Sequence, residues 1–493
     1  MSNPYPHGLS IIENPTSLTA PVVGTAAFQV VVGASPVNLA EDPYHSTNVV
    51  KLAYSLAEAS TAVGYSNNLK DYNLNQSISA TFTKFAVAPI ALINVLDPKK
   101  HKVTIPKSNY TVDALQAIVN VEGILLDTLL VEVGETVLQV NIDYITSFDE
   151  NGYAIIILLE NGAGKDATSL SVSGDKIDPS KITNADIIGG YDVNTGKESG
   201  LELIRQVYPL FGFVPGLITA PGYSKDPVVA AVMAAKCLKI NGVFTCECIV
   251  DLDCTPDGAT KYTDVKTVKE HSGFISEHLE PVWPKVRIGD EIYYYSAIYS
   301  ALVAYTDANN DDVPNLSASN KPLPITGLCL DDEDNSEIVV DQEQANTVNS
   351  FGVVTALNFN GFRSWGNNSA AYPQTSDPKD RWFCCRRFFS WWANNFILSY
   401  FQKVDEQADT RLIEAICDAE NIRGNSYVAQ GKCAGARITY NEDENPITDI
   451  LNGKIQFRQY LAPYTPAESI LNVLEFDPTM LEAALGGGGE SGV

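Results

Sequence analysis

Residues 217–252 decide the fold, and they read LITAPGYSKDPVVAAVMAAKCLKINGVFTCECIVDL. Residues 217–220 and 243–252 are predicted strands, and residues 227–238 between them are a predicted helix. Asp226 can cap the first free amides of that helix, and Pro227 stands in the first turn, where no amide hydrogen is needed. A strand, a helix and a strand in this order predict a parallel sheet with right-handed crossovers.

The same alternation precedes this stretch. Residues 28–32 and 91–96 are predicted buried strands, and residues 49–62 a predicted helix. A further helix is indicated by Leu74, Ile78 and Phe82, which lie at positions i, i+4 and i+8. The amino-terminal part therefore opens as an α/β unit.

The composition changes between about 99 and 186, where β-branched runs follow one another. The runs cover residues 129–133, 137–142 and 153–159, and Asn151-Gly152 is a hairpin signal. We expect an inserted β domain here.

Residues 381–404 show the clearest helical pattern of the chain. One apolar face steps by three or four residues through Trp382, Cys385, Phe389, Trp392, Phe396, Tyr400 and Val404. A second helix carries Leu412 and Ile416, with Gly424 placed to end it. Strands are predicted at residues 454–461 and 470–476, before a GGGGESGV terminus that cannot pack.

These patterns predict a multidomain fold of the mixed α/β (α+β) class. The expected parts are an amino-terminal arm (1–24), an α/β core (25–98 with 187–360), an inserted β-rich outer domain (99–186), a carboxy-terminal helical part of the inner core (361–453) and a carboxy-terminal strand arm with a flexible glycine tail (454–493).

Composition limits the possible partners. The 60 acidic and 33 basic residues give a net charge of -27, which disfavours attraction to nucleic acid phosphates. The start MSNPYPHGLS lacks the pattern of a signal peptide, and the apolar stretch 388–401 is too short to span a bilayer. Nine scattered cysteines fit reduced, buried thiols. We expect a cytoplasmically made protein with no membrane contact, no direct nucleic acid contact and no disulfide.

Several segments imitate catalytic or binding motifs without matching them. Residues 190–197 (GYDVNTGK) have the wrong spacing for a phosphate loop, and Glu198 stands where Ser or Thr must reach magnesium. Residues 162–169 (GAGKDATS) fail the spacing too. No serine lies in a Gly-x-Ser-x-Gly elbow, and His271 and His278 are explained as well by surface positions. We predict no catalytic residues and no cofactor.

Two segments carry residue types that bind metal ions. Cys246, Cys248 and Cys254 lack zinc-knuckle spacing, and His271 is the nearest candidate for a fourth ligand, so small core residues of a strand are favoured over zinc. Asp307, Asn309 and Asp311 alternate as in a calcium loop, but Asp312 replaces the required glycine and Ala318 the closing glutamate. We predict no metal site.

Arg381, Arg386 and Arg387 form a basic cluster on or near the polar side of the long aromatic helix. In so acidic a chain, two explanations stay open: pairing with carboxylates of the same chain, or salt bridges to another subunit.

Six segments taken in order resemble the contractile tail sheath family of myophages and phage-tail-like bacteriocins. They are HGLSIIENPTS (7–17), VPGLITAPGYS (214–224), VPNLSASNKPLPITG (313–327), NFNGFRSWGNNS (358–369), DRWFCCRRFFSWW (380–392) and FRQYLAPYTPAESI (457–470). Their order, more than any one of them, carries the resemblance.

The resemblance implies arms that add strands to sheets of neighbouring copies. The arm residues carried over in this way are Leu9, Ser10, Ile11, Ile12, Ile455, Gln456, Phe457, Arg458, Gln459, Tyr460, Leu461, Ile470, Asn472 and Leu474. It also implies a non-enzymatic subunit that forms a helical homopolymer of hexameric rings around a tail tube protein. That tube is then a second candidate partner for Arg381, Arg386 and Arg387. The baseplate and the tail terminator are further implied partners. Such a sheath belongs to a virion tail or tail-like particle assembled in the host cytoplasm, and its contraction drives the tube through a cell envelope.

Two alternatives stay open. One is a sheath component of a type VI-like secretion system. The other is a cytosolic α/β enzyme with a β insertion, because a parallel sheet can host a pocket at its strand ends.

Overall fold

The computed structural model describes residues 22–486, and a six-stranded sheet forms the centre of the core. The strand order is β17 (Leu279–Val282), β16 (Glu247–Asp251), β15 (Leu217–Thr219), β2 (Gln29–Gly33), β5 (Ile90–Asn94) and β3 (Val50–Ala53). All neighbours are parallel except β3, which is antiparallel to β5. The predicted mixed α/β fold with a parallel sheet is confirmed.

Helices cover this sheet, and every residue of its central strands β16, β15, β2 and β5 is buried. The helices of the core are α1 (Leu56–Val63), α2 (Asn73–Ser79), α3 (Asn184–Ile188), α4 (Val207–Phe211), α5 (Pro227–Lys236), α6 (Val265–Ser272), α7 (Tyr295–Ala308) and α8 (Gln342–Asn349). Asp226 accepts hydrogen bonds from the amides of Val228 and Val229, as predicted for the start of α5.

One predicted helix was wrong. Residues 49–62 form β3 and then α1, because Ser55 interrupts the segment and caps α1 by accepting a hydrogen bond from the Glu58 amide. The apolar residues before Ser55 extend along β5 instead of forming a helical turn.

Smaller strands complete the core. They are β1 (Val22–Val23) with β4 (Val87–Ala88), β13 (Gly190–Asp192) with β14 (Lys197–Ser199), β22 (Thr355–Asn358) with β23 (Phe362–Trp365), and a sheet of β19 (Glu291–Tyr293), β18 (Lys285–Ile288), β20 (Gly327–Cys329) and β21 (Glu337–Ile338).

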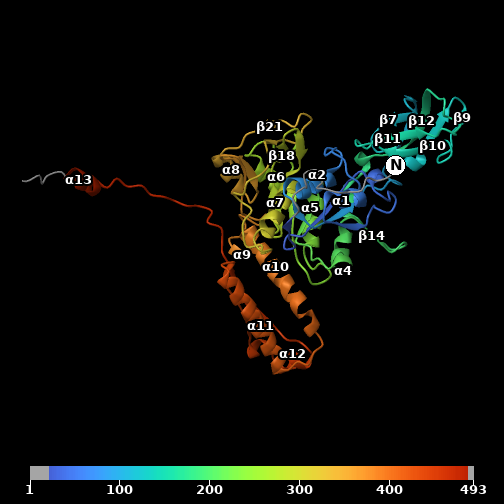
Figure 1. Ribbon diagram of the computed structural model, residues 1–493. Coiled ribbons are helices and arrows are strands. Elements are labelled where there is room, and N and C mark those ends of the chain that lie inside the picture. Colours follow the sequence, from blue (N-terminus) through green and yellow to red (C-terminus); the bar gives the residue numbers. More distant parts are fainter. Residues whose placement is uncertain (1–21, 487–493) are drawn as a thin grey trace, which may run out of the picture.

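Residues 102–177 form a β unit with its own hydrophobic core at one end of the molecule (Figure 1). Its two sheets are β6 (Lys102–Thr111), β12 (Ser169–Ile177), β8 (Leu130–Val133) and β9 (Thr136–Val137), and β10 (Tyr144–Phe148), β11 (Ala154–Leu158) and β7 (Gln116–Val119). Asn151-Gly152 lies in the β10–β11 hairpin, as predicted, and Gly152 has a φ of +78°.

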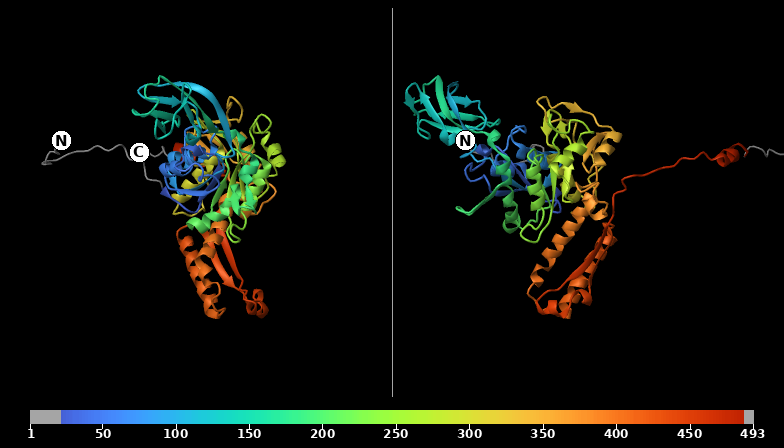
Figure 2. Two further views of the ribbon diagram at one scale, coloured as in Figure 1. Left: turned by 90° about the vertical axis from the view of Figure 1, so that its right-hand side faces the viewer. Right: turned by 180° about the vertical axis from the view of Figure 1, so that it is seen from behind.

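A carboxy-terminal unit projects from the core (Figures 1 and 2). It contains α9 (Pro378–Arg381), α10 (Phe383–Tyr400), α11 (Thr410–Ala429), β24 (Cys433–Tyr440), α12 (Ile447–Leu451) and β25 (Phe457–Pro463). An extended segment then leads to α13 (Pro478–Gly486). None of the described helices is long and apolar enough to cross a membrane.

The predicted end of α11 at Gly424 was also wrong. A Cβ at Gly424 would lie 2.6 Å from the Ala436 carbonyl oxygen. The glycine therefore permits close packing of α11 on β24, and the helix continues to Ala429.

Candidate assembly interface

The sheet of the carboxy-terminal unit has two strands, β24 and β25, within the described residues. The two strands are antiparallel, from Cys433 opposite Pro463 to Tyr440 opposite Phe457. The Asn421 side chain binds both backbone groups of Ile438 on β24. Its Nδ2 donates to the Ile438 carbonyl oxygen at 3.2 Å, and its Oδ1 accepts from the Ile438 amide at 3.0 Å. Those groups must therefore point away from β25, so this position of the β24 edge is already bonded.

The outer edge of β25 follows from the same pairing. Because Ile438 bonds outward and lies opposite Gln459, that pair exchanges no ladder hydrogen bonds. The backbone groups of Phe457, Gln459 and Leu461 therefore point away from β24. An unpaired edge of this kind is a template for another strand.

The segment after β25 is apolar and exposed. The exposed fractions are 87% for Ile470, 85% for Leu471, 86% for Leu474 and 79% for Phe476. The predicted strand at 470–476 is absent from the single chain, since these residues pair with no other described strand. Contiguous apolar exposure on a folded subunit marks a contact surface.

The other predicted arm residues divide into two groups. Ile455 and Gln456 precede β25, and Phe457 to Leu461 lie in it. Leu9, Ser10, Ile11 and Ile12 lie outside the described residues.

The three predicted arginines all meet carboxylates of their own chain. Arg381 pairs with Glu468 at 2.9 Å, and Arg386 pairs with Asp380 at 3.1 Å. Arg387 pairs with Asp307, and both side chains are almost wholly buried. Arg387 thus belongs to the interior of the subunit, which corrects its expected place on the polar surface of the helix.

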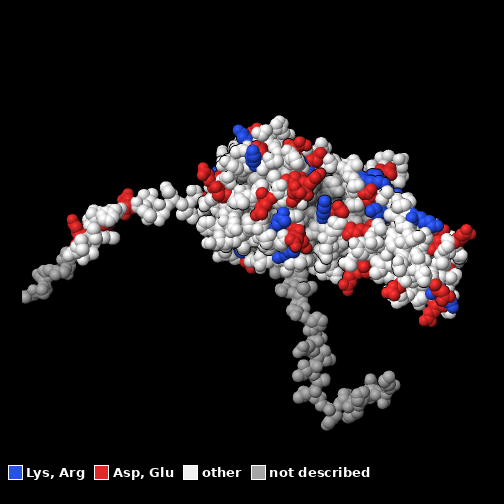
Figure 3. Space-filling model, turned by 90° about the horizontal axis from the view of Figure 1, so that it is seen from above, with Lys and Arg blue, Asp and Glu red and all other residues white. Residues whose placement is uncertain are grey.

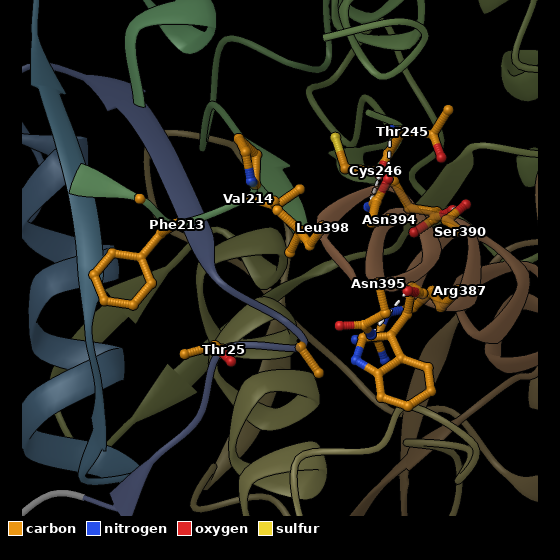
Figure 4. A pocket seen from close by; sticks show the side chains of 16 residues that line it. Thr25, Phe213, Val214, Thr245, Cys246, Arg387, Ser390, Asn394, Asn395 and Leu398 are labelled. Atoms are coloured by element: carbon orange, nitrogen blue, oxygen red, sulfur yellow. Dashed lines mark hydrogen bonds between the residues drawn. The ribbon is translucent and has the colours of Figure 1, made fainter. Parts of the chain in front are cut away.

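Arg387 is part of a buried polar stripe that joins α10 to the core and that the sequence reasoning missed. Ser390 donates to Glu247 at 2.6 Å, while Asn394 exchanges two hydrogen bonds with the backbone of Thr245. Figure 4 shows Ser390 and Asn394 of α10 close to Thr245 and Cys246. These residues help to line a cavity of about 260 Å³. Arg387, Ser390 and Asn394 lie at positions i, i+3 and i+7, so these polar residues share one face of the helix.

The buried charged groups where α10 meets the core, here called the α10 joint, shift one another's pKa values. Burial disfavours the Arg387 cation, but Asp307 holds the pKa of Arg387 above its ordinary value. Burial likewise opposes the charged form of His278, but Glu247 raises the pKa of His278. The joint is therefore a set of mutually dependent buried groups.

The segments that partly resemble enzyme or metal-binding motifs have structural roles in the fold. Residues 190–197 lie in the β13–β14 hairpin, and Cys246, Cys248 and Cys254 are buried. His271 is exposed, and His278 is buried rather than on the surface. Among residues 22–486, no group of three or more His, Cys, Asp and Glu side chains is placed to hold a metal ion.

Comparison with known proteins gives matches along the whole chain. The tail sheath protein of Burkholderia phage BcepMu is 23% identical over 513 residues, which cover 99% of this chain and 100% of that protein. Along its whole length, this chain is similar to a tail sheath protein. The major tail sheath protein of Serratia phage KSP20 is 24% identical, with 62% of this chain and 75% of that protein covered. These matches confirm the predicted resemblance, although no protein-family model matches the chain.

Two solved structures share the fold of this chain. A chain of the anti-feeding prophage baseplate has a TM-score of 0.56 at 13% identity, covering 95% of this chain and 98% of that chain. A chain of the contracted PVC sheath complex, from an extracellular contractile injection system, has a TM-score of 0.55 at 14% identity, covering 97% and 100%. At this identity the likeness concerns the fold alone.

Proposed function

We propose that this protein is the structural subunit of a contractile tail sheath. Copies polymerise into a helical tube of stacked hexameric rings around a tail tube protein. Contraction of the polymer drives that tube through a target cell envelope. The proposal is supported by a tail sheath protein that matches almost the whole chain and by a fold shared with contractile injection system proteins.

The observation that carries the proposal is a sheet with an unpaired edge, followed in the chain by an exposed apolar segment. The β25 edge offers backbone groups, and residues 470–476 offer a strand-length apolar stretch that pairs with no strand among residues 22–486. Strand addition satisfies both needs at once, because the edge gains hydrogen bonds and the apolar side chains leave water. The residues 9–12 and 470–474 are the proposed donors, and β25 is the proposed acceptor.

The remaining parts follow from this assignment. Residues 99–186 form the outer domain, residues 25–98 and 187–360 the core, and residues 361–453 the inner part. The carboxy-terminal arm was predicted to begin at residue 454, but β25 pairs with β24 of its own chain, so we assign β25 to the inner part and begin the arm after Pro463. The baseplate and the tail terminator close the two ends of the polymer. Assembly takes place in the host cytoplasm, and the role is structural, not catalytic.

Negative-stain electron microscopy of the purified full-length protein tests the proposal. We expect long hollow tubes with a helical repeat, either from the protein alone or on co-expression with its tail tube protein. A variant truncated after Pro463 keeps β25 and its pairing with β24 but lacks the apolar segment. It should stay folded by circular dichroism and form no tubes. Discrete full-length particles in both settings would contradict the proposal.

A further inference from the structure

The segment Asp307–Val313, here called the junction segment, lies where α7 ends. Its alternating acidic residues were weighed above as a calcium loop, but protein groups occupy its carboxylates. Asp307 binds Arg387 of α10, and Asp312 binds the backbone near the amino-terminal arm. The segment therefore makes contacts between distant parts of the chain.

The first contact holds the root of the amino-terminal arm. The Asp312 carboxylate accepts hydrogen bonds from the Thr25 amide at 2.8 Å, the Ala26 amide at 2.7 Å and the Thr25 hydroxyl at 2.5 Å. Gly24 lies against the end of α7, where an added Cβ would come 2.6 Å from the Ala308 Cβ. The Asp312 side chain thus holds the backbone of residues 25 and 26, directly after β1, which is itself paired with β4.

The second contact holds the root of the carboxy-terminal unit. Lys432, just before β24, donates from Nζ to the Asn310 carbonyl at 3.0 Å, to the Asn310 side chain at 2.8 Å and to Asp311 at 2.8 Å. Val313 is buried in a cluster with Phe388, Trp392 and Cys433, which come from α10 and β24. The junction segment is therefore inserted into the base of the carboxy-terminal unit.

The backbone between the two contacts is in an unfavourable conformation. Asp311 and Asp312 both have a φ of 58°, in the left-handed region that non-glycine residues rarely adopt. The Asp312 amide donates to the Asp307 carbonyl at 3.0 Å, which keeps this turn compact. A conformation of this kind persists only while the surrounding contacts hold it, so loss of one contact weakens the other.

We propose that the junction segment couples the two arms of the subunit, so that displacement of the amino-terminal root is transmitted to the sheet β24–β25. The meaning of this coupling rests on the proposed function, in which neighbouring copies pull on both arms. Coupling between two contacts is reciprocal, because each changes the other's equilibrium by the same factor. Disturbing either root must therefore loosen the other.

Hydrogen exchange of the full-length chain under non-polymerising conditions tests the proposal. Asp312→Ala removes the arm contact, and Lys432→Met removes the contact to the carboxy-terminal unit. We expect Asp312→Ala to speed exchange of the Lys432 amide and of β24 by about ten-fold or more, since bonds to charged groups have effects of that size. Lys432→Met should speed the Thr25 and Ala26 amides by a similar factor. Lys403→Met, which breaks an exposed pair with Glu406, is the matched control and should change neither root.

Effects confined to the mutated root in both variants would overturn the proposal. If Asp312→Ala fails to fold by circular dichroism, the response of Thr25 and Ala26 in Lys432→Met decides alone. Electron microscopy of the wild-type protein, alone and co-expressed with its tail tube protein, reports separately on tube formation. Reciprocal exchange with no tubes in either setting would support the coupling and contradict the sheath function. Tubes without reciprocal exchange would support the sheath function and contradict the coupling.

Discussion

The ion pair between Arg387 and Asp307 gives the sharpest stability prediction. The side chains are 3% and 1% exposed, so replacing Arg387 by Met leaves a carboxylate buried without its cation. Removing one partner of a buried pair costs about 3–5 kcal/mol. Because a folded domain is stable by only about 5–15 kcal/mol, the loss should be a large part of the stability of this region.

Two variants separate this effect from its alternatives. Arg386→Met breaks the pair with Asp380, whose side chain is 22% exposed, and should cost about 0–1 kcal/mol. The double variant Asp307→Leu with Arg387→Met removes both charges and should recover much of the loss, because an apolar pair of similar volume needs no compensation.

Urea unfolding followed by tryptophan fluorescence measures these differences, since Trp391 and Trp392 lie on α10 beside the pair. A midpoint for Arg387→Met equal to that for Arg386→Met would refute the reasoning. It would mean that water reaches Asp307 and that α10 is not fixed to the core by a buried charge.

Two further predictions concern the same joint and the sheet beside it. Gly424→Ala should destabilise the carboxy-terminal unit by about 1–3 kcal/mol, because the new Cβ would clash with Ala436. Gly435→Ala is the control: a Cβ there would meet no atom within 4 Å, so its effect in the same unfolding assay should be near zero. Equal effects of the two variants would contradict the close packing of α11 on β24. Glu247 raises the pKa of His278 above 6.5 in the folded protein. The stabilisation from the charged His278 is therefore fully present below pH 6.5 and is lost as the pH rises through the pKa of the folded state. His278→Gln should remove this pH dependence of the unfolding midpoint, and an unchanged pH profile would show that other groups cause it.

The parts of the fold that sequence predicts are those with local signals. Residues 217–252 carry a complete strand, helix and strand with a capping aspartate, and Asn151-Gly152 marks a hairpin. The β3–α1 boundary was missed because the apolar residues before Ser55 also fit a helical period. Local periodicity does not distinguish a strand followed by a short helix from one longer helix.

The candidate interface was predictable only in part. The β25 segment could be placed from its pattern, but Arg387 was assigned to the surface because its partner Asp307 lies 80 residues away. Gly424 looked like a helix end because its role depends on Ala436, which only the folded chain brings near. The role of a buried polar residue or of a close-packed glycine depends on a partner elsewhere in the chain, so the local sequence does not predict it.

In the proposed sheath, strands added to the β24–β25 sheet join one copy of this chain to the next. Helical reconstruction of the polymer by cryo-electron microscopy would show these joints. We expect the β25 edge at Phe457, Gln459 and Leu461 to be hydrogen-bonded to an extended segment from another copy, and residues 470–476 of each copy to lie as a strand in a neighbour's sheet. Tubes in which the β25 edge faces solvent, with copies joined through other surfaces, would contradict this expectation.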